Sequence, residues 1–522
     1  MSLQLRKLTL FVALVGVIVL AAATAFGVAA APQAAYHSFL PLLLGASGVT
    51  GATPPVTATT PPPTATTPTA TATPTATATP PPVTATTPPV TPTTPVPGWS
   101  PAGSLTTARE YHTATLLNSG AVLVAGGQGG VNGPTLISAE MWDPTLDTWY
   151  EAPDMSTARE LHTATLLPSG EVLVAGGASL SGNPSSLVPT ASAELFKTIP
   201  CITLAPQAPG AGQAPVAGGM ATRPHNGAAG PSTCVTKYEW SPTAFTMHAA
   251  RYGHTATLFT SGPDAGEVLV AGGTGSSGDR LGSAELYNPV TGDWSPVTNN
   301  MVFPRSGHTA TLLTSGAYAG DVLVAGGEGG NGTFREAELY NPSTGYWTIT
   351  GQMSAVRSGH AAVLLNSGPE AGDVLVAGGY DINGNPLDTA EVWDPTTNDW
   401  TAVDSMSGNS GGLTATQLSS GQTLVTGGAD STGPLANVEE YHTESCITLG
   451  RRVAGDGLRN GAASPSLLPP PAICYAWSSG TGMSTPRDGH TATLLASDQV
   501  LVVGGQYDIA GDLTNSAELF TP

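Results

Sequence analysis

From about residue 99 onward the chain alternates apolar and polar residues in short stretches separated by glycine-rich turns, and long helical patterns are absent. The stretch 305–347 holds one complete unit. A first segment alternates and ends at Leu312 and Leu313, a second ends at Gly-Gly, a third reads Ala-Glu-x-aromatic, and Trp347 lies seven residues beyond that aromatic. Period-two alternation bounded by glycine predicts strands. Each unit is therefore expected to form four short strands.

Seven copies of this unit follow one another. Each has a Gly-Gly pair, and the pairs begin at Gly126, Gly176, Gly272, Gly326, Gly378, Gly427 and Gly504. Each also has a third-strand glutamate with an aromatic residue two positions later, and these glutamates are Glu140, Glu194, Glu285, Glu338, Glu391, Glu439 and Glu518. Uninterrupted copies are 49 to 54 residues long. A period near 50 with four strands per copy predicts a β-propeller with one blade per copy.

The last copy lacks its fourth strand, because the chain stops two residues after Phe520. A matching segment stands at the other end of the repeats, where Trp99 precedes Leu105 by six residues, as Trp347 precedes Met353. We therefore expect the strand around Trp99 to complete the seventh blade. Such closure leaves the ring without an open end.

The recurring Gly-Gly, Glu, aromatic and Trp over residues 99–522 resemble the kelch-repeat family, in particular bacterial extracellular kelch or galactose-oxidase-like propellers. The resemblance implies a ring of seven blades, or of six in some members, and the seven copies favour seven. The expected fold is all-β, a seven-bladed propeller of four-stranded antiparallel blades.

Six copies carry Arg-x-x-His before the first strand: Arg109 and His112, Arg159 and His162, Arg251 and His254, Arg305 and His308, Arg357 and His360, Arg487 and His490. Residues present in nearly every repeat are expected to serve the fold. We expect each Arg to pair with a third-strand Glu or to bond inter-blade carbonyls, and each His to pack under the central mouth. The alternative is a ring of basic groups that holds an anionic ligand or a metal.

The sixth copy has Ser410 and Leu413 in place of the Arg and the His. If the basic residues serve the fold, this blade is loosened locally. If they line a pocket, the pocket becomes asymmetric. The sequence leaves both open, so Ser410 and Leu413 are candidate ligand residues.

All four cysteines lie in two related insertions between third and fourth strands, at about 198–237 and 443–474. Both insertions begin Cys-Ile-Thr-Leu and both contain Asn-Gly-Ala-Ala-x-Pro-Ser. A disulfide across the neck of each insertion, Cys201 with Cys234 and Cys446 with Cys474, is the simplest pairing. Metal–thiolate sites are the weaker alternative, since no Cys-x-x-Cys is present.

In a four-stranded meander the insertions share a face with the loops between first and second strands, and the loops after Gly-Gly lie on the opposite face. The loops that contain Asp381 and Asn383, and Asp508 and Asp512, resemble the start of a calcium loop but lack the bidentate Glu. Hairpin turns are the default reading, and a weak cation site is the alternative.

The N-terminal 98 residues have a different composition. Arg6 and Lys7 precede an apolar run that ends near Ala31, which predicts for residues 1–31 an export signal or a retained membrane anchor. A short connecting segment, 32–48, leads to residues 49–97, which are almost entirely Thr, Pro, Ala and Val without charge. This composition predicts a disordered, extended stalk, with O-glycosylation as a compatible refinement. The propeller follows over 98–522. We expect an extracellular or cell-surface protein.

The net charge of −21 disfavours nucleic-acid binding. The sequence has no phosphate-binding glycine loop, no His-Glu-x-x-His and no nucleophile elbow, so no catalytic residue, metal ligand or cofactor is predicted. Galactose oxidase, which shares the repeat, needs a copper site with a cysteine linked to tyrosine, and this chain has no cysteine outside the insertions. We expect a monomeric, non-catalytic module that binds a glycan or an extracellular protein. A carbohydrate-active oxidase or lyase with an atypical cross-blade site is the alternative.

Overall fold

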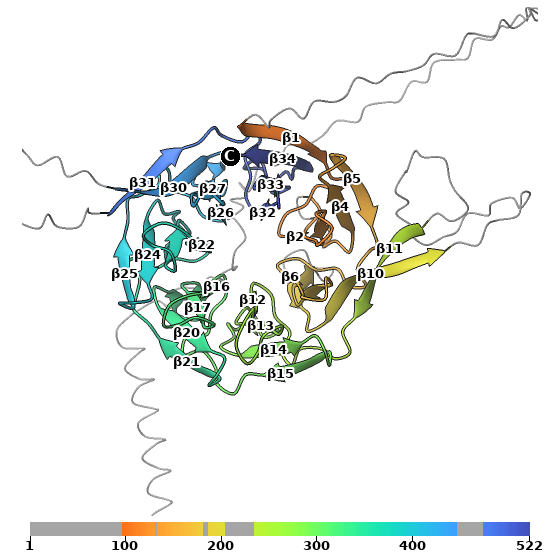
Figure 1. Cartoon of the computed structure of the whole chain (residues 1–522), viewed down its shortest axis with the longest axis horizontal. Coiled ribbons are helices and arrows are strands. Elements are labelled where there is room, and N and C mark those ends of the chain that lie inside the picture. The colour runs from red at the N-terminus through yellow and green to blue at the C-terminus, as the bar shows by residue number, and fades with distance from the viewer. Residues whose placement is uncertain (1–96, 131–132, 181–185, 204–233, 446–472) are drawn as a thin grey trace, which may run out of the picture. The chain divides into compact units, whose positions relative to one another are not determined.

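The computed structural model describes residues 97–130, 133–180, 186–203, 234–445 and 473–522. These residues form strands, turns and loops, with no helix among them. Accordingly, nothing in the described ranges is a helix long and apolar enough to cross a membrane. Seven antiparallel four-stranded sheets surround a central axis (Figure 1). The predictions of an all-β fold and of seven blades are confirmed.

The innermost strand of each blade has the sequence Thr-Ala-Thr-Leu or a close variant. These strands are β2 (Thr113–Leu116), β6 (Thr163–Leu166), β12 (Thr255–Leu258), β16 (Thr309–Leu312), β22 (Ala361–Leu364), β26 (Thr414–Gln417) and β32 (Thr491–Leu494). The second strands are wholly buried: β3 (Val122–Ala125), β7 (Val172–Ala175), β13 (Val268–Ala271), β17 (Val322–Ala325), β23 (Val374–Ala377), β27 (Thr423–Thr426) and β33 (Val500–Val503).

The third strands carry the glutamate: β4 (Ala139–Asp143), β10 (Ala193–Thr203), β14 (Ala284–Asn288), β20 (Ala337–Asn341), β24 (Ala390–Asp394), β30 (Val438–Ser445) and β34 (Ser516–Thr521). The outer strands carry the Trp: β5 (Thr148–Ala152), β11 (Cys234–Pro242), β15 (Asp293–Pro296), β21 (Tyr346–Ile349), β25 (Asp399–Ala402), β31 (Ile473–Ser479) and β1 (Gly98–Ser104). Short hairpins follow Gly-Gly in three blades: β8 (Ala178–Leu180) with β9 (Leu187–Pro189), β18 (Glu328–Gly329) with β19 (Gly332–Thr333), and β28 (Ala429–Asp430) with β29 (Gly433–Pro434).

The second strands make the core because both of their faces are covered by neighbouring blades. Leu123 and Ala125 pack in one cluster with Val172 and Val174 of the next blade. Val122 and Val124 of the same strand pack in another cluster with residues of blade seven. This arrangement repeats around the ring in seven clusters. Each blade is therefore stabilised by both neighbours.

Strand β1 closes the ring by pairing with β34, so the first described strand and the last lie in one sheet (Figure 1). Trp99 lies opposite Phe520, and their ring centroids are 5.2 Å apart. The Trp99 indole donates to the carbonyl of Thr481 at 2.8 Å. The predicted closure of the seventh blade is confirmed.

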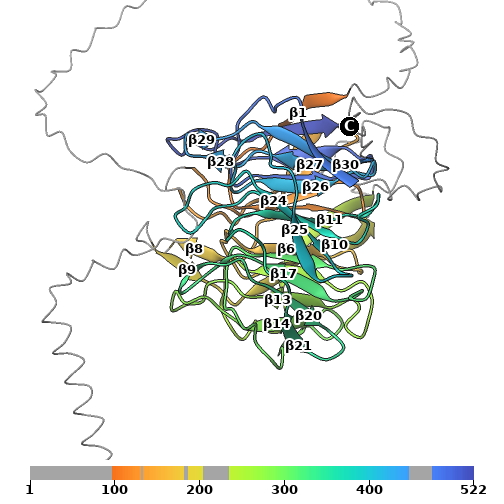
Figure 2. The same ribbon diagram turned by 90° about the vertical axis from the view of Figure 1, so that its left-hand side faces the viewer.

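The two faces of the ring carry different loops. The hairpins β8–β9 and β28–β29 project on one face (Figure 2). We call this the Gly-Gly-loop face, and it also carries the Arg-x-x-His segments, since Glu110 pairs with Gln128, the residue after Gly-Gly. In blades two and six, β10–β11 and β30–β31 extend as paired ribbons into the expected insertions.

Candidate functional site

All six arginines of the repeat are completely buried, and each donates from Nη2 to the third-strand glutamate of its own blade. The N–O distances are 2.7 to 2.9 Å. The pairs are Arg109–Glu140, Arg159–Glu194, Arg251–Glu285, Arg305–Glu338, Arg357–Glu391 and Arg487–Glu518. Buried ion pairs of this kind need further hydrogen bonds to be tolerated.

Blade four shows how the remaining polar atoms are used. Arg305 Nη1 donates to the carbonyls of Gly326 at 2.7 Å and Glu336 at 2.8 Å, both within its own blade. The Glu338 carboxylate accepts the backbone N–H groups of Val302 at 2.7 Å and Phe303 at 3.1 Å. Each arginine therefore links the start of its blade to the ends of the second and third strands, and none is free to bind an anion.

The six histidines connect neighbouring blades instead. Each Nε2 is hydrogen-bonded, at 2.9 to 3.2 Å, to the threonine that begins the innermost strand of the preceding blade. Burial lowers the pKa of all six, to about 3 for His308 and His490, so they are neutral at neutral pH. The six are His112, His162, His254, His308, His360 and His490.

Blade six replaces both interactions without opening a pocket. Ser410 Oγ donates to the carbonyl of Gly427 at 2.8 Å, which is the bond that the arginine makes elsewhere. Leu413 is buried against Gly378, where the other blades place the histidine ring. The preceding blade begins its innermost strand with Ala361 in place of threonine, so an apolar pair replaces the Thr–His pair. Ser410 and Leu413 thus serve packing, and neither is brought to a surface.

The third residue of each Arg-x-x-His segment forms a ring of peptide groups around the axis, which we call the axial ring. Its members are Tyr111, Leu161, Gly253, Gly307, Gly359, Gly412 and Gly489, all with φ between 52° and 70°. Six of them donate their N–H to the carbonyl of the preceding member at 2.9 to 3.1 Å. The N–H of Gly489 instead donates to Asp488 Oδ1 at 2.9 Å. Left-handed φ explains the five glycines, and Tyr111 and Leu161 are the exceptions.

The residues that precede the axial ring include three consecutive acids, Asp488 of blade seven, Glu110 of blade one and Glu160 of blade two, which we call the axial carboxyls. Their exposed fractions are 7%, 7% and 2%. A Cβ placed on Gly489 would lie 3.1 Å from the Tyr111 ring and 3.4 Å from Glu110 Oε2. Asp488 Oδ1 lies against Gly412 in the same way. Each of these two carboxyls therefore lies against the axial-ring glycine of the preceding blade.

The axial carboxyls lack a compensating positive charge. Burial, with the nearby charges of Asp488 and Glu160, raises the pKa of Glu110 to about 8. Burial also raises the pKa of Glu160 and that of Asp488 to about 7. Oε2 of Glu160 is buried and has no hydrogen-bond partner. Neighbouring carboxyls with shifted pKa values and no ion-pair partner are typical of functional sites.

Two tyrosines stand beside these acids. Burial, followed by the charges of Glu110 and Asp488, raises the pKa of Tyr111 well above its usual range. Burial and the charge of Asp488 likewise raise the pKa of Tyr380, whose ring lies against Gly411 next to Gly412. Both phenols are therefore neutral near pH 7.

Sequence reasoning missed these residues because it treated the two central positions of Arg-x-x-His as spacers. A comparison of the two central residues among the seven repeats would have revealed them. The central pairs are Glu-Tyr and Glu-Leu in the first two blades and Asp-Gly in the seventh, whereas blades three to six have Tyr-Gly, Ser-Gly, Ser-Gly and Gly-Gly. The acids are therefore specific to three adjacent blades.

The candidate cation loops are hairpin turns. Asp381 Oδ1 accepts the backbone N–H groups of Asn383 at 2.7 Å and Asn385 at 2.8 Å. Asp508 Oδ1 accepts those of Ala510 at 3.0 Å and Asp512 at 2.9 Å. These carboxylates are used within their own turns. Across the described ranges, no three His, Cys, Asp or Glu side chains converge to hold a metal ion.

The cysteine pairing falls outside what the structure describes. Cys446 lies outside the described residues, and for Cys201, Cys234 and Cys474 only the backbone is described. In that backbone Thr203 lies opposite Cys234 and Glu444 opposite Cys474. Residues 1–96, with the expected export segment and most of the stalk, also lie outside.

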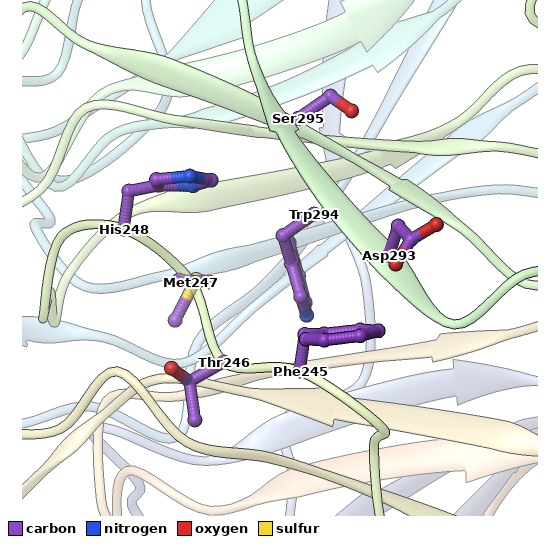
Figure 3. Close-up of a pocket in the computed structure, with 7 residues that line it drawn as sticks. All are labelled: Phe245, Thr246, Met247, His248, Asp293, Trp294 and Ser295. Carbon is purple, nitrogen blue, oxygen red and sulfur yellow. The ribbon is translucent and has the colours of Figure 1, made fainter.

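Two surface hollows occur at the outer strands, at the same place in the repeat. One lies between Phe245–His248 and Asp293–Ser295 of β15, where Phe245 and Trp294 stand side by side (Figure 3). The other lies between Pro153 and β11. Trp240 in the second hollow donates to the Pro153 carbonyl at 2.8 Å. Because the two hollows occupy equivalent places in two blades, their position alone does not indicate a ligand site.

Comparisons with known proteins agree with this architecture. The kelch motif matches residues 111–156, 256–301 and 371–407, which fall in blades one, three and five. Kelch-like protein 24 of Homo sapiens is 32% identical over 128 residues, 24% of this chain and 19% of that protein. Kelch-like protein 15 of Mus musculus is 38% identical over 63 residues, 12% of this chain and 10% of that protein. The chain thus spans about a fifth or less of the curated relatives that it matches.

Among solved structures, a fungal alcohol oxidase of the AA5 family in complex with copper superposes with a TM-score of 0.53 at 15% identity. The superposition covers 82% of this chain and 77% of that one. At this identity the likeness shows the fold alone. A copper centre does not fit the described residues, because six histidines are bonded to threonines around the ring and His248 is bonded to Glu285.

Proposed function

We propose that this β-propeller, three of whose blades match the kelch motif, is a non-catalytic binding module that recognises a protein partner at the centre of its Gly-Gly-loop face. The observation that carries this proposal is the set of axial carboxyls, Glu110, Glu160 and Asp488. They break the sevenfold repetition on one side of the mouth and have no cationic partner among the described residues.

The rest of the repeated chemistry is already used within the fold, which supports binding over catalysis. The six arginines are paired with glutamates, and the six histidines are neutral and bonded to threonines. General acid–base catalysis needs a group with a suitable pKa within reach of substrate and of a nucleophile or an electrophile. The axial carboxyls have suitable pKa values, but the contacts described for Glu110 and Asp488 are with Gly489 and Gly412, which supply no nucleophile.

The expected export segment and the uncharged Thr/Pro stretch support a location outside the cell or on its surface. An extended stretch of 49 residues, from 49 to 97, could reach on the order of 150 Å at about 3 Å per residue. In this proposal the stretch holds the propeller away from its attachment point. Fractionation of the native cells, with an antibody against the propeller, tests the location.

Binding can be tested with the full-length chain on an array of extracellular proteins and an array of glycans. The proposal expects protein ligands whose binding falls in a Glu110→Gln variant and is unchanged in Asp399→Asn, which alters an exposed acid at the start of β25. Glycan ligands alone would contradict the choice of a protein partner. The absence of any ligand on either array would contradict a binding role.

A further inference from the structure

We propose that the axial carboxyls and Tyr111 form a recognition site for one positively charged side chain, the ammonium of a lysine or the guanidinium of an arginine, presented by the protein partner. This inference rests on the proposed binding role, and it adds the chemistry of the contact. Nothing in the repeat itself requires acids at this place, because four of the seven blades have Tyr, Ser or Gly there.

The first support is an unsatisfied carboxylate. Glu160 is 2% exposed, and its Oε2 is buried without a hydrogen-bond donor. Leu161, the residue after Glu160, donates its N–H to the carbonyl of Tyr111 at 3.1 Å, so Glu160 follows Glu110 around the axis. A buried acceptor that lacks a donor destabilises the protein, and an incoming N–H group would supply that donor.

The second support is the absence of an internal counter-charge. Each axial carboxyl directly follows an arginine of the repeat in sequence. These arginines, Arg109, Arg159 and Arg487, donate to Glu140, Glu194 and Glu518, and all three are fully buried. Arg280, on the Gly-Gly-loop face, is paired with Glu328. Among the described residues, no ion pair joins a basic side chain to an axial carboxyl, and the three buried arginines are committed to other glutamates.

The third support is the spacing of the carboxylates. After burial, the charges of Asp488 and Glu160 contribute to the raised pKa of Glu110, yet no three acids in the described residues converge closely enough to hold a metal ion. Separated carboxylates suit a cation whose several N–H groups spread in different directions. An ammonium or guanidinium has that geometry. A small divalent ion instead needs several oxygen ligands at once, each within about 2.6 Å of the ion.

Tyr111 adds an aromatic surface at the same point. Its φ of 52° is one that side chains with a Cβ rarely adopt, whereas five of the seven ring members are glycine. Retained strain of this kind is a reason to look for function. The ring lies beside Glu110 at Gly489, so a cation paired with Glu110 would also lie near an aromatic ring.

The test is a selection of peptides that bind the purified full-length chain, from a displayed library of random twelve-residue sequences. The selected peptides are expected to share a lysine or arginine, and replacing it with norleucine should weaken binding about tenfold or more. Glu110→Gln and Asp488→Asn should each weaken binding to a similar extent. Asp279→Asn, which removes the same charge from an exposed loop on the same face, should change it less than twofold.

The outcomes separate the two proposals. Binders without a shared basic residue, or basic binders that are insensitive to Glu110→Gln and Asp488→Asn, would overturn the cation site and leave a binding role in place. A selection that yields no binder to the folded wild-type chain would contradict the binding role itself. Thermal unfolding of each variant shows whether it is folded, and Gln is a neutral isostere of the glutamate that it replaces.

Discussion

The backbone N–H of Tyr111 donates to the carbonyl of Gly489 at 3.1 Å, and the Tyr111 ring lies against the same glycine. This contact joins blades one and seven at the axis, 378 residues apart in the chain, and sets an aromatic ring beside Glu110 and Asp488. Because it requires a left-handed backbone, the chain tolerates strain at Tyr111 that a glycine would remove.

Replacing Tyr111 with glycine should therefore separate stability from binding. Relief of the left-handed strain, about 1 kcal/mol, offsets the lost packing, so the free energy of unfolding should stay within about 1 kcal/mol of wild type. Affinity for the selected peptides should fall about tenfold. Leu161→Gly relieves the same strain in blade two without removing an aromatic ring, and should leave affinity within twofold. Equal loss of affinity in both variants would rule out a specific role for the tyrosine.

Breaking an Arg–Glu pair should strongly destabilise the blade that contains it. Arg305→Ala leaves the Glu338 carboxylate buried without its cation, so we expect the free energy of unfolding in urea to fall by about 3–5 kcal/mol. Arg335→Ala, an exposed position in the same blade, should cost less than about 0.5 kcal/mol. Similar costs for the two variants would show that the buried pair contributes little.

The Ala361–Leu413 contact should be exchangeable with the Thr–His pair of the other blades. Leu413→His alone should cost about 1–3 kcal/mol, because the imidazole is buried without its threonine. Adding Ala361→Thr should restore part of this loss, with a coupling free energy of about 1 kcal/mol in a double-mutant cycle. Strict additivity of the two substitutions would show that the histidines do not depend on the threonines.

The free energy of unfolding should fall both when the pH drops below about 6.5 and when it rises above that value. The six histidines have lowered pKa values, so they bind protons first in the unfolded state, and stability falls as the pH drops below about 6.5. Four acids have raised pKa values of about 7 to 8: Glu110, Glu160, Asp488 and the half-buried Asp373. Ionising them above the pKa of an ordinary carboxyl therefore costs free energy in the folded state. Stability should therefore fall again as the pH rises from 6.5 to 8.5.

Between pH 4.5 and 6.5 the two groups oppose each other, and the six histidines outnumber the four acids, so the maximum should lie near pH 6.5. Each titrating group contributes up to about 1.4 kcal/mol per pH unit. Urea denaturation across this range measures the profile, and Glu110→Gln should flatten its alkaline side. A free energy of unfolding that keeps rising to pH 8.5 would contradict the raised pKa values.

Much of the fold could be predicted from the sequence, because each blade repeats the same residue types at nearly the same spacing. The Gly-Gly, Glu and Trp spacings predicted seven blades, and the displaced Trp99 predicted the closure with Phe520. The shared repetition of Arg and Glu also suggested their pairing. What repetition could not indicate was the inter-blade partner of each histidine, since the threonine belongs to the preceding copy.

The candidate site escaped prediction for a related reason. Asp488, Glu110 and Glu160 are separated by up to 378 residues, and only closure of the ring makes their blades consecutive. Their raised pKa values depend on burial at the axis, which the spacing of Arg-x-x-His does not reveal. The breaks in the repeat instead pointed to Ser410, Leu413 and the aspartate turns, where the structure shows packing and hairpin hydrogen bonds.

The cation site also predicts how binding depends on pH. The acids and phenols at the site are Glu110, Glu160, Asp488, Tyr111 and Tyr380. The segments that carry the acids also contain the buried His112, His162, His490, Arg109, Arg159 and Arg487. The histidines and phenols stay neutral and the arginines stay charged between pH 6 and 8.5, so only the three carboxyls change charge. A cation binds them best when they are ionised, and lysine keeps its charge over this range.

The most direct measurement is therefore the affinity of a selected basic peptide for the full-length chain at fixed ionic strength, from pH 6 to pH 8.5. The account predicts that affinity rises about tenfold or more over this interval, and that the rise is much smaller in Glu110→Gln and Asp488→Asn. An affinity that is independent of pH in the wild-type chain, or a rise of equal size in both variants, would contradict it.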